Sequence, residues 1–199
     1  MASALLQFQN NIDSIKDLKG TTDTISSITT PVLNVSDFYR AQIVLVVSAL
    51  DHFVHEHVLT EMIEIYRGNK SVTSAFMKFP IPLSCAYNST SRPLDILVLD
   101  AIRTRHSWLS FQDPDKIADA IRLISEMNIW EELARNMRLA PRDLKTRIKL
   151  IIERRNKIAH EADMDPTNPG EKWPITSNDV LETINFVSKV VLELYNITH

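Results

Sequence analysis

Residues 141–161 read PRDLKTRIKLIIERRNKIAHE, and this stretch decides the fold. It begins with a proline, which the first turn of a helix tolerates, and its apolar side chains then recur three and four residues apart. These apolar side chains belong to Leu144, Ile148, Ile151, Ile152 and Ile158. The spacing predicts a long amphipathic helix over about residues 141–161 that packs its apolar face against other helices.

The rest of the chain has the same helical periodicity. It predicts six further helices, over about residues 2–18, 36–66, 93–111, 114–127, 129–137 and 177–196. Gly20 and the Ser/Thr-rich segment 21–30 predict the end of the first helix and a connecting loop. Residues 69–93 are rich in Pro, Ser and Asn and predict an irregular excursion with at most one helical turn. No strand pattern, repeat or linker competes, so we expect a single all-α domain over residues 1–199, a bundle of about six to seven helices.

Composition excludes several classes of function. The single cysteine, Cys85, excludes an internal disulfide framework and multi-cysteine metal sites, and the three glycines exclude Gly-rich phosphate loops. A net charge of −3 is not that of a protein that binds nucleic acid over its whole surface, so any basic site must be local. No signal peptide is recognisable, and the longest apolar run, residues 43–50, is too short to span a membrane. We therefore expect a soluble, cytoplasmic protein.

Arg155 interrupts the apolar face of the 141–161 helix. An ideal helix turns by about 100° per residue, which places the apolar residues of this helix within roughly 60° of Arg155. A buried guanidinium without a partner costs several kcal/mol, so Arg155 must meet a carboxylate, an open polar cleft or a subunit interface. Asn156 and His160 lie one turn apart on the flank of the same face and can share one ligand.

These three residue types suit RNA cleavage. Arginine is a fixed cation for phosphate, asparagine both donates and accepts hydrogen bonds, and histidine exchanges a proton near pH 7. Attack by a 2′-hydroxyl on the adjacent phosphate needs these properties and no metal or cofactor. The alternative is a solvated charged face, because residues 142–157 contain seven basic and two acidic side chains. Arg154 and Lys157 are expected to point away from the apolar face and can hold phosphates there.

The motif resembles the signature of HEPN domains, an arginine followed after four to six residues by a histidine. Arg155, Asn156, His160 and the following Asp163 carry this resemblance. Two more segments, LDHFVHE at 50–56 and SFQDPDKI at 110–117, look like the RiboL-PSP type of HEPN domain found in prokaryotic defence and toxin loci. Together the three segments extend the resemblance over residues 37–195.

The resemblance implies an all-helical homodimer with metal-independent endoribonuclease activity in toxin or antiviral defence. In it, Arg155 and His160 would be catalytic and Asn156 would orient or polarise. The helix geometry is compatible with a cleft shared by two subunits, since Arg155 and His160 lie about 140° apart on one helix. The expected partners are RNA, a second copy of the chain and a neutralising or activating protein. The alternative is a catalytically inactive HEPN module that binds RNA or protein. Another HEPN branch is modified on a tyrosine two residues after the histidine; Ala162 stands there in this chain.

Other side chains are weaker candidates. His52, His55, Glu56 and His57 form the densest group of potential metal ligands, but their order is not His-Glu-x-x-His, so we predict no metal site. Asp51 and His55 either face the cleft, pair with a buried arginine such as Arg155, or form a surface pair. Four aromatic residues can stack on bases: Trp108, Phe111, Trp130 and Trp173. Core packing is the expectation for the first three.

Overall fold

The structure, a computed structural model, describes residues 3–30, 33–87 and 93–199. Within these ranges the chain forms nine helices and no extended strand, which confirms the all-α prediction. Seven of the helices have nine or more residues, and α3 (Ser74–Met77) and α4 (Leu83–Tyr87) are short. Residues 69–87 thus contain two short helices where the sequence predicts at most one.

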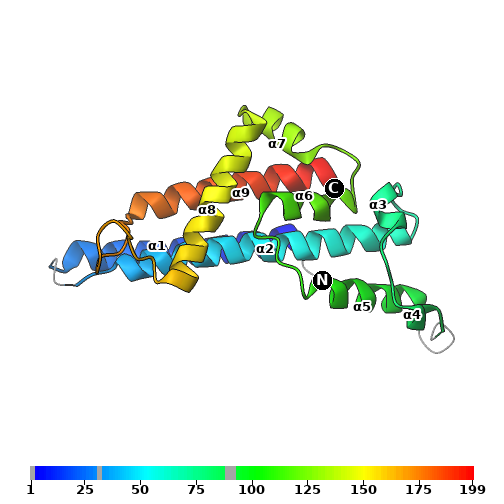
Figure 1. The fold of residues 1–199 in the computed structure, drawn as a ribbon, viewed down its shortest axis with the longest axis horizontal. Coiled ribbons are helices and arrows are strands. Elements are labelled where there is room, and N and C mark those ends of the chain that lie inside the picture. Colours follow the sequence, from blue (N-terminus) through cyan, green and yellow to red (C-terminus); the bar gives the residue numbers. More distant parts are fainter. Residues whose placement is uncertain (1–2, 31–32, 88–92) are drawn as a thin grey trace.

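Helix α2 (Ser36–Tyr66) is the centre of the bundle. Helices α1, α5, α6, α8 and α9 all pack against it, as Figure 1 shows. Among the described residues, α2 is the one helix long and apolar enough to cross a membrane, with a mean hydropathy of 1.3. Most of its apolar side chains are covered by the neighbouring helices, with Val46, Val54 and Val58 fully buried, whereas Phe38 and Leu45 are exposed. This is typical of the core helix of a soluble protein.

Helix α1 (Ala4–Ile28) is longer than predicted and continues through Gly20. The expected loop at 21–30 is therefore wrong over most of its length. Tertiary contacts explain the difference: the buried Thr22 hydroxyl accepts a hydrogen bond from Gln42 Nε2 of α2 at 2.9 Å. Asp23 accepts one from the Tyr39 hydroxyl at 2.8 Å. These contacts hold the segment against α2 and outweigh the weak helix propensity of glycine and threonine.

Two other helices end earlier than the sequence predicts. Helix α5 (Leu94–His106) stops short of Phe111, and α6 (Pro114–Arg122) stops short of Met127. The Phe111 N–H donates to Asp51 of α2 instead of continuing the helical pattern of hydrogen bonds. Asp113 caps α6 as expected, accepting from the N–H groups of the first turn.

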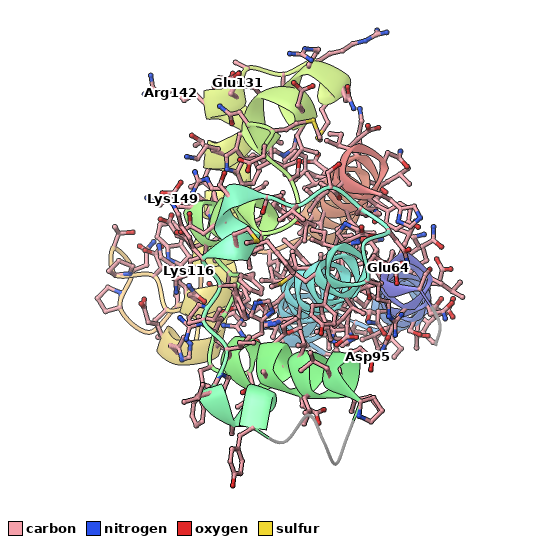
Figure 2. All side chains as sticks on the ribbon, turned by 90° about the vertical axis from the view of Figure 1, so that its right-hand side faces the viewer. Glu64, Asp95, Lys116, Glu131, Arg142 and Lys149 are labelled. Carbon is pink, nitrogen blue, oxygen red and sulfur yellow. The ribbon has the colours of Figure 1, made fainter. Side chains whose placement is uncertain are left out.

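Helix α8 (Pro141–Glu161) has the bounds that the sequence predicts, and in Figure 1 it crosses α2. It follows α7 (Ile129–Met137) and leads through the loop 162–176 to α9 (Ser177–Thr198). Leu144, Ile148 and Ile152 are buried on its inner face. Its outer face is basic: Figure 2 shows Arg142 and Lys149 at the surface on the same side of the molecule as Lys116 of α6.

Candidate functional site

The last turns of α8 carry the three residues of the predicted motif. Arg155 is half-buried, and its Nη1 donates to Asn156 Oδ1 at 3.1 Å. Its Nε is buried without a hydrogen-bond partner, and Arg155 forms no ion pair with any residue that the structure describes. A guanidinium is a cation at every physiological pH. Arg155 is therefore a partly desolvated cation that no carboxylate among the described residues neutralises.

His160 and Lys157 lie at the surface of the same helix. The His160 side chain is exposed, and no hydrogen bond joins it to Arg155 within the described parts of one chain. Lys157 is also exposed, with its Nζ 5.6 Å from the centre of the Trp173 ring. An exposed imidazole can reach a ligand from solvent.

Arg154 occupies a different place from the one its sequence position suggests. Its Nη2 donates to Asp163 Oδ2 at 2.8 Å and to the carbonyl oxygens of Trp173 and Pro174 at 3.2 and 3.1 Å. Asp163 is fully buried, and its Oδ2 also accepts from Arg40 Nε of α2 at 2.7 Å. The expectation that Arg154 points away into solvent is therefore wrong.

The turn after α8 explains this arrangement. Ala162 and Asp163 both adopt left-handed backbone conformations, with φ of 52° and 59°. The turn folds the Asp163 side chain back between Arg154 and Arg40. Nothing in the local sequence shows this, because Arg40 and Asp163 are 123 positions apart.

Asp51 and His55 lie where α2 meets the loop between α5 and α6. Asp51 accepts from the Phe111 N–H at 2.6 Å and from Gln112 Nε2 at 3.2 Å. The His55 ring packs on Phe111, with 4.4 Å between ring centres, and its Nε2 is 3.9 Å from Asp51 Oδ1. Asp51 pairs with no arginine in the described residues. These contacts join the two segments 50–56 and 110–117.

The histidines of α2 point to different surroundings. His52 is exposed, whereas His57 is buried and shares a hydrogen bond with the Thr198 hydroxyl at 2.6 Å. Burial lowers the pKa of His57 to about 4. Within the described ranges, no group of three or more His, Cys, Asp or Glu side chains is arranged to hold a metal ion. The side chain of Cys85 lies outside the described residues.

Sequence reasoning missed His106 and misplaced one tryptophan. His106 is 4% exposed, neither ring nitrogen has a hydrogen-bond partner in the described part of the chain, and burial lowers its pKa to about 4. It borders a cavity of about 290 Å³ between α2 and α5 that His52 and Arg103 also line. Phe111 and Trp130 are buried as expected, but Trp108 is 87% exposed because α5 ends two residues before it.

Comparison with known proteins supports the resemblance seen in the motifs. The RiboL-PSP-HEPN family model matches residues 7–198, which is nearly the whole chain. No curated protein and no solved structure matches the chain. HEPN domains are generally associated with ribonuclease activity, and the matched region contains Arg155, Asn156 and His160. The chain belongs to the RiboL-PSP-HEPN family.

Proposed function

We propose that the protein is a metal-independent endoribonuclease in which Arg155 stabilises the phosphate and His160 transfers the proton. One observation carries this assignment. Both Arg154 and Arg155 stand four to six residues before His160, so spacing alone does not choose between them. Arg154 forms an ion pair with the buried Asp163, whereas Arg155 forms no ion pair within the described residues. Arg155 is therefore the cation available to a phosphate.

The reaction that fits these groups is attack by a ribose 2′-oxygen on the adjacent phosphorus. The bond between O2′ and phosphorus forms and the bond from phosphorus to the 5′-oxygen breaks, which leaves a 2′,3′-cyclic phosphate and a 5′-hydroxyl. His160 takes the proton from the 2′-hydroxyl or gives one to the leaving 5′-oxygen, and water exchanges the other proton. Arg155 stabilises the charge that builds on the phosphoryl oxygens.

Asn156 has a supporting part in this proposal. Its Oδ1 accepts from Arg155 Nη1 at 3.1 Å, which fixes the plane of the guanidinium. Its amide nitrogen forms no hydrogen bond with the described residues and is free to donate to the RNA. Asn156 therefore orients Arg155 and holds the substrate, while the proton transfer belongs to His160.

A shared cleft between two subunits completes the site. Arg155 and His160 lie about 140° apart around α8, too far for short side chains to converge within one helix. A two-fold partner brings the Arg155 of one subunit close to the His160 of the other. Exposed cations of α8 such as Arg142 and Lys157 then hold the RNA backbone. The biological role we propose is that of a cytoplasmic toxin or antiviral effector controlled by a neutralising or activating protein.

Incubation of the purified protein with mixed RNA in EDTA tests the function. Cleavage in the chelator that is lost in His160→Ala, with the variant still folded, supports the nuclease. Retention of RNA on the protein without cleavage points instead to a binding module that uses the same surface. Equal cleavage by the wild type and His160→Ala contradicts the assignment of the histidine.

A further inference from the structure

We infer that Asp163, held between Arg40 and Arg154, is a positioning residue that fixes the last turn of α8 and thereby places His160. The inference rests on the proposed nuclease function. In this proposal Asp163 does not touch the substrate, and Arg40 of α2 anchors its carboxylate. It also gives Arg154 a role in positioning rather than in holding RNA.

Asp163 is fixed by both its side chain and its backbone. The buried carboxylate accepts from Arg40 Nε at 2.7 Å and from Arg154 Nη2 at 2.8 Å. The Asp163 N–H donates to the Lys157 carbonyl at 3.0 Å, and its own carbonyl accepts from the Trp173 N–H at 2.9 Å. One residue thus connects α2, α8 and the loop that follows α8.

The two arginines also hold that loop. The Trp173 carbonyl accepts from Arg40 Nη2 at 2.5 Å and from Arg154 Nη2 at 3.2 Å. Both guanidiniums therefore bridge the same carboxylate and the same carbonyl. Arg40 makes its two contacts with different nitrogens of one planar guanidinium, Nε and Nη2, and the point charge of a lysine cannot reproduce that geometry.

His160 lies within the segment that this arrangement clamps. Arg154 precedes it by six residues and Asp163 follows it by three. Helix ends otherwise fray, and the exposed His160 side chain has no hydrogen bond or ion pair with the described residues to prevent this. The left-handed conformations of Ala162 and Asp163 are unfavourable for residues with a side chain, and the ion pairs offset this cost. Without the carboxylate, the turn relaxes and His160 loses its fixed position.

Asp37 provides a matched control. It pairs with the same Arg40, at 3.2 Å, and with Lys172 at 2.8 Å, but its side chain is 68% exposed and does not contact α8. Asp37→Asn therefore removes a carboxylate from the same arginine without releasing the end of α8. It is expected to leave kcat and KM for RNA within about twofold of the wild type.

The test compares Asp163→Asn with Asp37→Asn in the protein of residues 1–199. Asp163→Asn is expected to lower kcat at least tenfold per folded molecule and to leave KM nearly unchanged, because the cations that hold RNA are retained. The ¹H–¹³C ring signal of His160, assigned with His160→Ala, is expected to shift or broaden in Asp163→Asn and to stay unchanged in Asp37→Asn. A wild-type kcat per folded molecule with an unshifted His160 signal overturns the inference.

If Asp163→Asn does not fold, Arg40→Lys replaces it as the test variant. Lysine keeps the positive charge but cannot bridge the Asp163 carboxylate and the Trp173 carbonyl together. Arg40→Lys is expected to lower kcat and shift the His160 signal, and a wild-type result in both refutes the positioning role. If the wild type does not cleave RNA at all, the proposed function fails. The His160 signal still reports whether Asp163 fixes the helix end.

Discussion

Neighbouring arginines on α8 are predicted to respond differently to the same substitution. Arg154→Met removes one of two guanidiniums from buried Asp163, together with hydrogen bonds to two backbone carbonyls. Breaking a buried ion pair costs about 3–5 kcal/mol. Because Arg40 remains on the carboxylate and the Arg154 side chain is 27% exposed, we expect a loss of about 2–3 kcal/mol in the free energy of unfolding. For a domain of this size that lowers the melting temperature by roughly 4–12 °C.

Arg155→Met is expected to change stability little and activity greatly. Among the described residues, the native side chain makes a hydrogen bond only to the adjacent Asn156 and leaves a buried Nε unpaired. Methionine removes that unpaired group and continues the apolar face, so the free energy of unfolding should stay within about 1 kcal/mol of the wild type. Loss of a group that stabilises developing charge typically costs about 10²–10³ in rate, and cleavage should fall by that factor.

The assay measures urea unfolding and RNA cleavage for both variants. Protein concentration is held constant, because any self-association makes the measured stability depend on it. An equal loss in the free energy of unfolding for Arg155→Met and Arg154→Met would refute the reasoning, because Arg155 would then have a structural partner. Arg155→Met also refutes the reasoning if it cleaves RNA at the wild-type rate.

Three other outcomes follow from the structure. Burial holds the pKa of His106 near 4, below its usual 6.5, so the unfolded state binds a proton at a higher pH than the folded state does. The free energy of unfolding should therefore fall by up to about 3 kcal/mol as the pH drops from 6.5 to 4. His106→Phe should remove this part of the pH dependence of the urea midpoint, and an unchanged slope would argue against it. Asp51→Ala leaves the buried Phe111 N–H unpaired and should cost about 2–4 kcal/mol in thermal unfolding, while a loss under about 1 kcal/mol contradicts the role of that contact. Two single variants, Arg155→Ala and His160→Ala, should regain about a quarter of wild-type cleavage when they are refolded together, if each site takes one residue from each subunit. No recovery of cleavage rules out the shared cleft.

Local sequence signals predicted the helices whose ends are locally determined. The helix predicted over 36–66 is followed by Gly68, whose φ is +79°. The helix predicted over 141–161 begins at a proline. Both helices have the predicted bounds. The helix through Gly20 was missed because α2 supports that segment with contacts that a local pattern does not contain.

The candidate site divides in the same way. The position of Arg155 on the apolar face of α8 follows from helical periodicity, and the structure places it half-buried. The pairing of Arg154 with Asp163 depends on a left-handed turn and on Arg40, which lies in another helix. Asp51 likewise contacts a loop 60 positions away. Such long-range pairs have no periodic signal in one sequence.

The most direct test of the central claim uses one RNA oligonucleotide and its copy with 2′-deoxyribose throughout, both in EDTA. The account predicts that the wild type cuts the RNA to products ending in a 2′,3′-cyclic phosphate, leaves the deoxy copy intact, and loses this activity in Arg155→Met and His160→Ala. Cutting of the deoxy copy, or intact RNA after incubation with the folded wild-type protein, would contradict it.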